Sequence, residues 1–207
     1  NVPAVVGLRN VTSAVQSDDL LLVDGAKGIV YINPTEARLS DYAERSKHQA
    51  VIRKELDLLR DKPPETIDGH HISLTANIEL LEELDGVEAG GAKGIGLYRT
   101  EFLFLGADAL PDEFEQTEAY IKAAKSQYPA TVVIRTLDLG ADKMSDTVDA
   151  PREMNPFLGL RAIRLCLDRP ELFRTQLRAI LRASVNKNIK LMYPMVTGVA
   201  EVKEANA

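Results

Sequence analysis

Cysteine and basic charge are both scarce in this chain. Its 207 residues include one cysteine, and 25 Lys and Arg stand against 31 Asp and Glu, which gives a formal net charge of −6. A single cysteine excludes an internal disulfide and is typical of a reducing, cytoplasmic compartment. The acidic balance argues against a general binder of nucleic acid or anionic membranes, because both need a basic surface. It leaves room for local basic sites that bind small anions.

Long apolar runs are also lacking. No run approaches the ~20 residues that a membrane-spanning helix needs, and no basic head followed by an apolar stretch indicates a signal peptide. The sequence begins with Asn1 rather than Met, on a strand-like apolar run, so we expect a piece of a longer protein. Apolar residues at 45% and charged residues at 27% are ordinary for a soluble globular chain of one domain, or one domain and part of another.

The first 34 residues have a β-rich pattern. Residues 20–23 and 29–32 are short apolar runs, and the connection between them contains two glycines. This pattern predicts two strands with a tight turn. Pro34 should end the second strand, because proline cannot donate to a sheet hydrogen bond.

Residues 35–63 predict one long helix. Opposite charges recur at helical spacing, as in Asp41 and Arg45, and the apolar stripe is narrow. Pro63 should end the helix, because the residue before a proline avoids the α region. A highly charged helix between two different patterns is typical of a connector between domains.

Residues 64–207 alternate strand-like and helix-like segments. Strands are expected at 72–76, 94–98, 131–134 and 190–194, and helices at 79–84, at 111–125, and within 158–167 and 171–184. Repeated strand–helix units predict a parallel sheet with right-handed crossovers, hence an α/β fold. From the pattern alone, the sheet could be doubly wound or part of a (β/α)8 barrel, of which four units are about half.

Two arginines end neighbouring predicted strands. Arg99 follows residues 94–98, and Arg135 follows residues 131–134. Ligands of parallel α/β folds sit at the carboxyl ends of the strands, and adjacent strands lie about 5 Å apart. The two guanidinium groups could therefore grip one phosphate or carboxylate. Alternatively, each arginine could pair with Glu101 or Asp138 and serve structure alone.

Other candidates carry less chemistry. Arg161 could be a third anion contact, but its position favours a surface helix residue. Gly94 and Gly96 lack the third glycine of a dinucleotide-binding loop, so we expect them to permit close packing. Cys166 lies in an apolar helical run and should be a core residue. We expect no metal site at His70-His71 and no nucleophile–base pair in this chain.

Three segments resemble one family closely. Residues 94–104 read Gly-Ile-Gly-Leu-Tyr-Arg-Thr-Glu-Phe-Leu-Phe, residues 133–143 read Val-Ile-Arg-Thr-Leu-Asp-Leu-Gly-Ala-Asp-Lys, and residues 155–164 follow the same family pattern. The family is enzyme I of the bacterial sugar phosphotransferase system, the phosphoenolpyruvate–protein phosphotransferases. The resemblance covers nearly the whole chain, and the second segment distinguishes it from pyruvate phosphate dikinases and phosphoenolpyruvate synthases.

The resemblance implies a domain plan and a substrate. Residues 1–34 would be the end of the swivelling phosphohistidine domain, residues 35–63 the connector helix, and residues 64–207 the first half of a phosphoenolpyruvate-binding (β/α)8 TIM barrel. Arg99 and Arg135 would hold the phosphate of phosphoenolpyruvate, and Arg161 would lie near the same site. The family moves the phosphoryl group to its own histidine and then to the phosphocarrier HPr, which drives sugar uptake.

The family's other functional groups have no counterpart in the chain. By resemblance, the phosphorylated histidine lies upstream, whereas the Mg²⁺ ligands and the catalytic cysteine lie downstream. We therefore expect an inactive fragment of a cytoplasmic, homodimeric, Mg²⁺-dependent enzyme. Two alternatives stay open: a naturally short, non-catalytic module that binds phosphoenolpyruvate or a partner, and a fragment of a dikinase or synthase.

Half a barrel would also expose the inward faces and two open edges of its sheet. Unpaired edges and large apolar patches favour association. We therefore expect the chain either to dimerise through that face or to continue in a longer polypeptide.

Overall fold

The computed structural model describes residues 2–105, 109–140, 155 and 159–207. The chain divides into two compact units, Asn1–Lys62 and Pro63–Ala207. In the part of the chain that is described, no helix combines the length and the apolar character that crossing a membrane would need.

The first unit contains the predicted hairpin. Strand β1 (Leu21–Asp24) pairs antiparallel with β2 (Ile29–Ile32), and a short helix, α1 (Val11–Ala14), precedes them. Asn33 closes the open end of the hairpin, because its side chain accepts a hydrogen bond from the Leu20 amide at 3.0 Å. None of the described residues of this unit is buried, so local hydrogen bonds contribute more to its structure than a core does.

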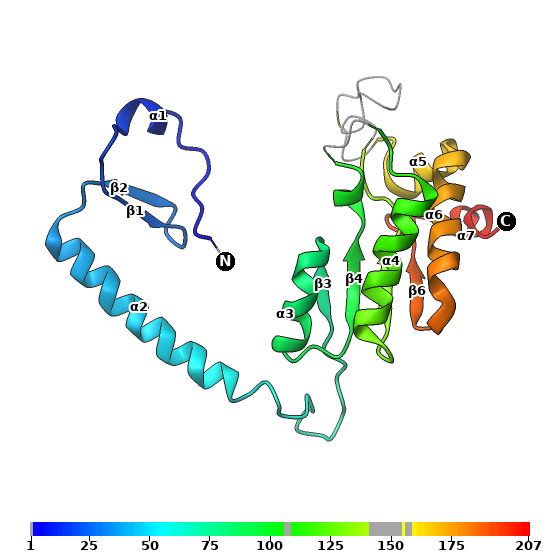
Figure 1. Cartoon of the computed structure of the whole chain (residues 1–207), viewed down its shortest axis with the longest axis horizontal. Helices are drawn as coiled ribbons and strands as arrows, with labels where there is room; N and C mark the ends of the chain where they lie inside the picture. The colour runs from blue at the N-terminus through cyan, green and yellow to red at the C-terminus, as the bar shows by residue number, and fades with distance from the viewer. Residues whose placement is uncertain (1, 106–108, 141–154, 156–158) are drawn as a thin grey trace. The chain divides into compact units, whose positions relative to one another are not determined.

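The predicted long helix is shorter than expected. Helix α2 spans Glu36–Asp57 (Figure 1), whereas the sequence pattern extended it to Pro63. Beyond Asp57 the chain tightens into turns, in which the Leu59 amide donates to the Leu56 carbonyl at 2.9 Å. The helix buries no residue, so no packing holds its last turns in the α conformation.

The second unit is a parallel sheet with helices packed against it. Among the described residues, its four strands lie in the order β3-β4-β5-β6, and each neighbouring pair is parallel, which confirms the predicted α/β sheet. The order follows the sequence without the reversal that defines a doubly wound sheet. The strands are β3 (Ala76–Ile78), β4 (Ile95–Arg99), β5 (Val132–Arg135) and β6 (Ile189–Met192).

The main helices follow the strands along the chain. The described α-helices are α3 (Leu84–Ala89), α4 (Glu113–Gln127), α5 (Ala162–Asp168), α6 (Pro170–Ala183) and α7 (Val199–Ala205), and the described 3-10 turns are η1 (Leu81–Glu83), η2 (Glu101–Leu103) and η4 (Ser184–Asn186). Asp112 caps α4, because its carboxylate accepts the Glu115 amide hydrogen bond at 2.8 Å. Pro170 occupies the start of α6, where its missing N–H costs nothing.

The first strand of the sheet was predicted in the wrong place. The alternating pattern at 72–76 predicted a strand there, but β3 begins at Ala76 and ends at Ile78. Ile72 and Leu74 are 47% and 54% exposed, whereas Ile78 is 1% exposed. Burial of Ile78 therefore sets the register, and the alternation at 72–76 marks a loop that leads into the sheet.

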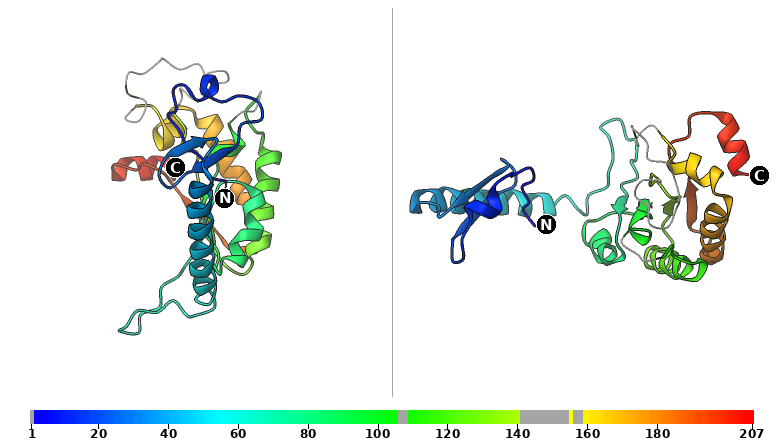
Figure 2. Two further views of the ribbon diagram at one scale, coloured as in Figure 1. Left: turned by 90° about the vertical axis from the view of Figure 1, so that its left-hand side faces the viewer. Right: turned by 90° about the horizontal axis from the view of Figure 1, so that it is seen from above.

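One core joins the sheet to α3, α4 and α6. Ile95, Tyr98, Val132 and Ile134 of the two central strands form a single buried cluster with side chains of these helices, which lie on one side of the sheet (Figure 2). Tyr98 meets Tyr120 of α4 edge to face, with ring centroids 6.0 Å apart. This core fixes the two strands whose carboxyl ends carry Arg99 and Arg135.

Candidate anion-binding site

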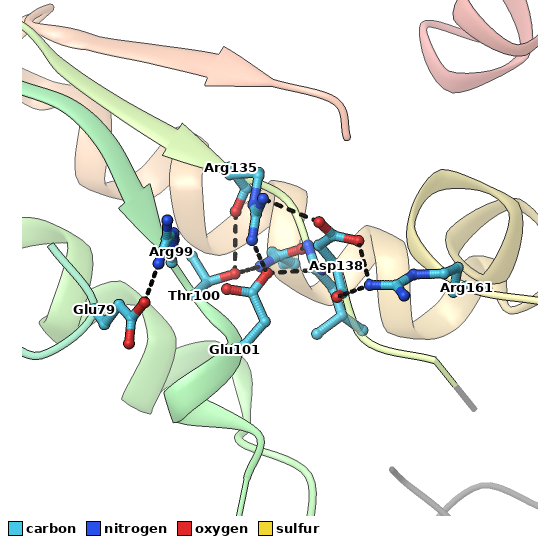
Figure 3. Close-up of polar contacts among 9 residues, drawn as sticks. Glu79, Arg99, Thr100, Glu101, Arg135, Asp138 and Arg161 are labelled. Atoms are coloured by element: carbon cyan, nitrogen blue, oxygen red, sulfur yellow. Dashed lines mark hydrogen bonds and ion pairs between the residues drawn. The ribbon is translucent and has the colours of Figure 1, made fainter. Parts of the chain in front are cut away.

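Arg99 and Arg135 occupy equivalent positions on neighbouring strands. Arg99 is the last residue of β4 and Arg135 the last residue of β5, and the two are register partners in the parallel pairing. This confirms the predicted placement at one carboxyl edge of the sheet. The side chains of both arginines are drawn in Figure 3 with their carboxylate partners.

Gly94 and Gly96 allow the sheet to pack closely around β4. Gly94 has a φ of +119°, and a Cβ added there would lie 2.6 Å from the Thr131 carbonyl oxygen. A Cβ at Gly96 would collide with the Thr75 hydroxyl. The two glycines therefore serve packing, as expected, and have no place in a phosphate-binding loop.

Arg99 pairs with Glu79, a residue that the sequence pattern did not single out. An Nη1–Oε1 ion pair joins them, and their side chains are 41% and 36% exposed. Glu83 lies close by: hydrogen bonds from the amides of Glu79 and Leu80 lower the pKa of its carboxyl, with a smaller contribution from Arg99. Because the Arg99 side chain is so open to solvent, it should be easy to release from its partner.

Arg135 is held by two carboxylates at once. Its Nη2 lies 3.0 Å from Glu101 Oε1, and its Nη1 lies 3.0 Å from Asp138 Oδ2. Glu101 also accepts a hydrogen bond from the Asp138 amide at 3.0 Å. The three side chains are 20%, 11% and 14% exposed. Arg135 therefore does form the ion pairs with Glu101 and Asp138 that the sequence offered as an alternative to anion binding. Arg99 does not pair with either of these residues, because its partner is Glu79.

Arg161 reaches the same cluster from a different element. It is the residue before α5, and its Nη2 lies 3.2 Å from both the carboxylate and the carbonyl oxygen of Asp138. With 19% of its side chain exposed, Arg161 is no surface helix residue, so that interpretation was wrong. Sequence position could not reveal this, because Asp138 and Arg161 meet only through the tertiary fold.

The backbone next to Arg161 is strained. Ala162 has a φ of +53°, a conformation that costs an L-residue with a Cβ about 1–2 kcal/mol. Its amide donates to the Leu139 carbonyl at 3.2 Å, and Arg161 forms an isolated bridge with Gly140. These bonds hold the segment of Arg161 against the segment of Asp138.

The numbers of cationic and anionic side chains in these ion pairs are equal, and a bound anion could take the place of the carboxylates. The cluster's three guanidinium groups face three carboxylates, those of Glu79, Glu101 and Asp138 (Figure 3). An arginine fork binds carboxylate and phosphate oxygens with the same geometry. A phosphate placed between the arginines could therefore replace the carboxylates as their partner.

The remaining candidates take no part in this cluster. Cys166 is fully buried, as predicted for a core residue, and burial raises the pKa of its thiol to about 12. Among the described residues, no group of three or more His, Cys, Asp or Glu side chains could hold a metal ion. Residues 141–143 and 156–158, which belong to the segments that resemble the enzyme I family, lie outside the described residues.

Comparison with known proteins assigns the chain to a family. Residues 53–207, about three quarters of the chain, match the family described as PEP-utilising enzyme, PEP-binding domain. The chain belongs to this family. The matched residues include the whole parallel sheet and all three arginines, so the candidate site lies inside the PEP-binding domain.

Curated relatives extend the likeness to the whole chain. A protein of Staphylococcus carnosus is 50% identical over 206 residues, one of Staphylococcus epidermidis is 49% identical over 206 residues, and one of Listeria monocytogenes is 47% identical over 204 residues. Each carries the name phosphoenolpyruvate-protein phosphotransferase. The alignments cover 99–100% of this chain, but the chain spans 36% of the length of each relative.

Proposed function

We propose that this chain supplies the arginine-lined part of the phosphoenolpyruvate site in a phosphoenolpyruvate–protein phosphotransferase. The observation that carries the proposal is the register of Arg99 and Arg135 at one edge of a PEP-binding domain. The names of the curated relatives support this activity over that of a dikinase or synthase. The consecutive strand order supports a sheet that forms the first half of a (β/α)8 barrel.

Each arginine has a role in this proposal. Arg99 and Arg135 bind the phosphate of phosphoenolpyruvate, and Arg161 adds a third cation beside it. Glu79, Glu101 and Asp138 hold the guanidinium groups in place without substrate and yield them to the phosphate. Because Arg135 and Arg161 are partly buried and held by these ion pairs, they can offset negative charge on the transferring phosphoryl group at little reorganisation cost.

The rest of the reaction is assigned to the longer protein. There, a histidine on another domain accepts the phosphoryl group and passes it to the phosphocarrier HPr, in support of sugar uptake. The family resemblance places the Mg²⁺ ligands beyond this chain, and among the described residues no three His, Cys, Asp or Glu side chains gather as a metal site. We further propose a cytoplasmic, homodimeric parent and, apart from the substrate-binding arginines, no catalytic residue within this chain.

Labelling tests the proposal in the intact natural protein that contains this chain. With ³²P-labelled phosphoenolpyruvate, Arg99→Ala should slow labelling roughly 10²-fold or more, the scale for one lost transition-state contact. Arg174→Ala is the matched control, because Arg174 also pairs with a glutamate but lies on α6 with 64% of its side chain exposed. The control should label at the wild-type rate. Wild-type labelling in Arg99→Ala would contradict the proposed role.

A further inference from the structure

A buried amide lies behind the arginines. Gln176 of α6 is 1% exposed. Its Nε2 donates to the Thr100 hydroxyl at 3.1 Å and to the Tyr120 hydroxyl at 3.1 Å, and its Oε1 accepts from the Leu137 amide at 2.9 Å. Both amide hydrogens and the carbonyl oxygen therefore have partners, as a buried amide requires.

Each hydroxyl that accepts a hydrogen bond from Gln176 donates one to a further acceptor. The Thr100 hydroxyl donates to the Arg135 carbonyl at 3.0 Å, and the Tyr120 hydroxyl donates to Gln116 Oε1 at 3.2 Å. The amide of Gln116 in turn donates to the Pro111 carbonyl at 2.9 Å. Each hydroxyl has one proton to give, so the donation from Gln176 leaves that proton free for the next acceptor. A side chain that cannot donate at position 176 would break this order.

One branch of the network reaches the backbone that carries the arginines. Thr100 directly follows Arg99 at the end of β4, and Leu137 lies two residues beyond Arg135 at the end of β5. The side chain of Gln176 donates a hydrogen bond to the Thr100 hydroxyl and accepts one from the Leu137 backbone amide. It therefore ties one helix to both strand ends at the point where the guanidinium groups leave the sheet.

We propose that Gln176 is a positioning residue for the anion site, which acts through Thr100 and the Leu137 amide on the two strand ends. This inference rests on the proposed function. Gln176 is too deeply buried to touch a ligand, so its effect is on where Arg99 and Arg135 stand. A displacement of about 1 Å at such a distance can cost 10²-fold in rate.

Two variants of the intact natural protein test the positioning role. Gln176→Met keeps the size of the side chain and removes its donors and acceptor, and Thr100→Val removes the hydroxyl that links Gln176 to Arg135. Each should raise the KM for phosphoenolpyruvate and lower kcat/KM at least tenfold. Combined, they should lose less than the product of the single losses, because they break the same connection.

Asn188→Leu is the matched control. Asn188 is also a buried amide, and it donates to the carbonyls of Ala124 and Ala130 at 2.9 Å each, but it precedes β6 at the opposite end of the sheet. It should lower the melting temperature as Gln176→Met does and leave KM unchanged. A loss of folded protein alone lowers apparent kcat without moving KM, so KM separates positioning from stability.

The outcomes separate this inference from the proposed function. A raised KM in both test variants, with KM unchanged in Asn188→Leu, supports positioning. If Gln176→Met does not fold, Thr100→Val decides by the same criterion. Near wild-type KM in the folded variants, with labelling lost in Arg99→Ala, overturns positioning and leaves the function intact. Wild-type labelling in Arg99→Ala contradicts the function itself.

Discussion

Replacement of Arg135 by alanine should impair phosphoryl transfer in two separable ways. The substitution removes a fork that contacts Glu101 and Asp138 at 3.0 Å each, and with it a contact proposed for the phosphate. It also leaves the three carboxylates of the cluster facing two cations. The remaining site carries an excess negative charge, which opposes the binding of anionic phosphoenolpyruvate.

The two effects have different sizes. One uncompensated charge about 6 Å from one charge of the ligand costs on the order of 3 kcal/mol at an effective dielectric constant of about 20, and the 20% exposure of the Arg135 side chain reduces that figure. Loss of a preorganised donor costs roughly 3–4 kcal/mol in the transition state. We therefore expect a KM at least about tenfold higher and a kcat roughly 10²–10³-fold lower.

A second substitution separates these effects. Arg135→Ala combined with Glu101→Gln restores the balance of charge without restoring the fork, so KM should recover in part and kcat should stay low. Arg135→Lys keeps the cation but loses the bidentate geometry, so its kcat should stay at least tenfold below wild type. Steady-state labelling of the intact natural protein measures both constants. A wild-type kcat in either Arg135→Ala or the double variant would show that Arg135 does not stabilise the transition state.

Three further predictions concern the 207-residue chain by itself. It should take no stoichiometric label from ³²P-phosphoenolpyruvate with Mg²⁺, and should not label HPr, because the family resemblance places the acceptor histidine outside this chain; stoichiometric label would contradict this. It should self-associate in light scattering, because β6 is an edge strand with three of its four residues exposed; a monomeric, cooperatively folded chain would contradict the half-barrel. At pH 8, native Cys166 should react with a disulfide reagent far more slowly than in the urea-unfolded chain, because burial raises its pKa to about 12; equal rates would show that it is accessible.

The sequence predicted that Arg99 and Arg135 stand at strand ends, but it did not predict that Glu79 forms an ion pair with Arg99. Arg99 and Arg135 follow short apolar runs that predict buried strands, and parallel pairing then brings them together. The partner of Arg99 was missed because Glu79 lies twenty residues earlier, on a segment whose strand was itself misplaced. Register depends on burial in the finished core, and a three-residue strand has too little pattern to reveal it.

The buried network was beyond prediction for a different reason. Gln176 looks like any polar residue in an amphipathic helix, and only the packing of α6 against the sheet shows that it points inward. The same holds for Arg161, whose sequence position favoured the surface although its guanidinium bonds to Asp138 in the folded chain. Residues that act across elements leave no spacing signal in a single sequence.

A structure of the intact natural protein with phosphoenolpyruvate bound would be the sharpest test of the proposed site. We expect phosphate oxygens within about 3 Å of guanidinium nitrogens of both Arg99 and Arg135, with Arg161 beside them. The ion pairs of these arginines with Glu79 and Glu101 should be broken or lengthened. Phosphoenolpyruvate bound elsewhere, with both arginines still paired to their carboxylates, would contradict the proposed role of the two arginines.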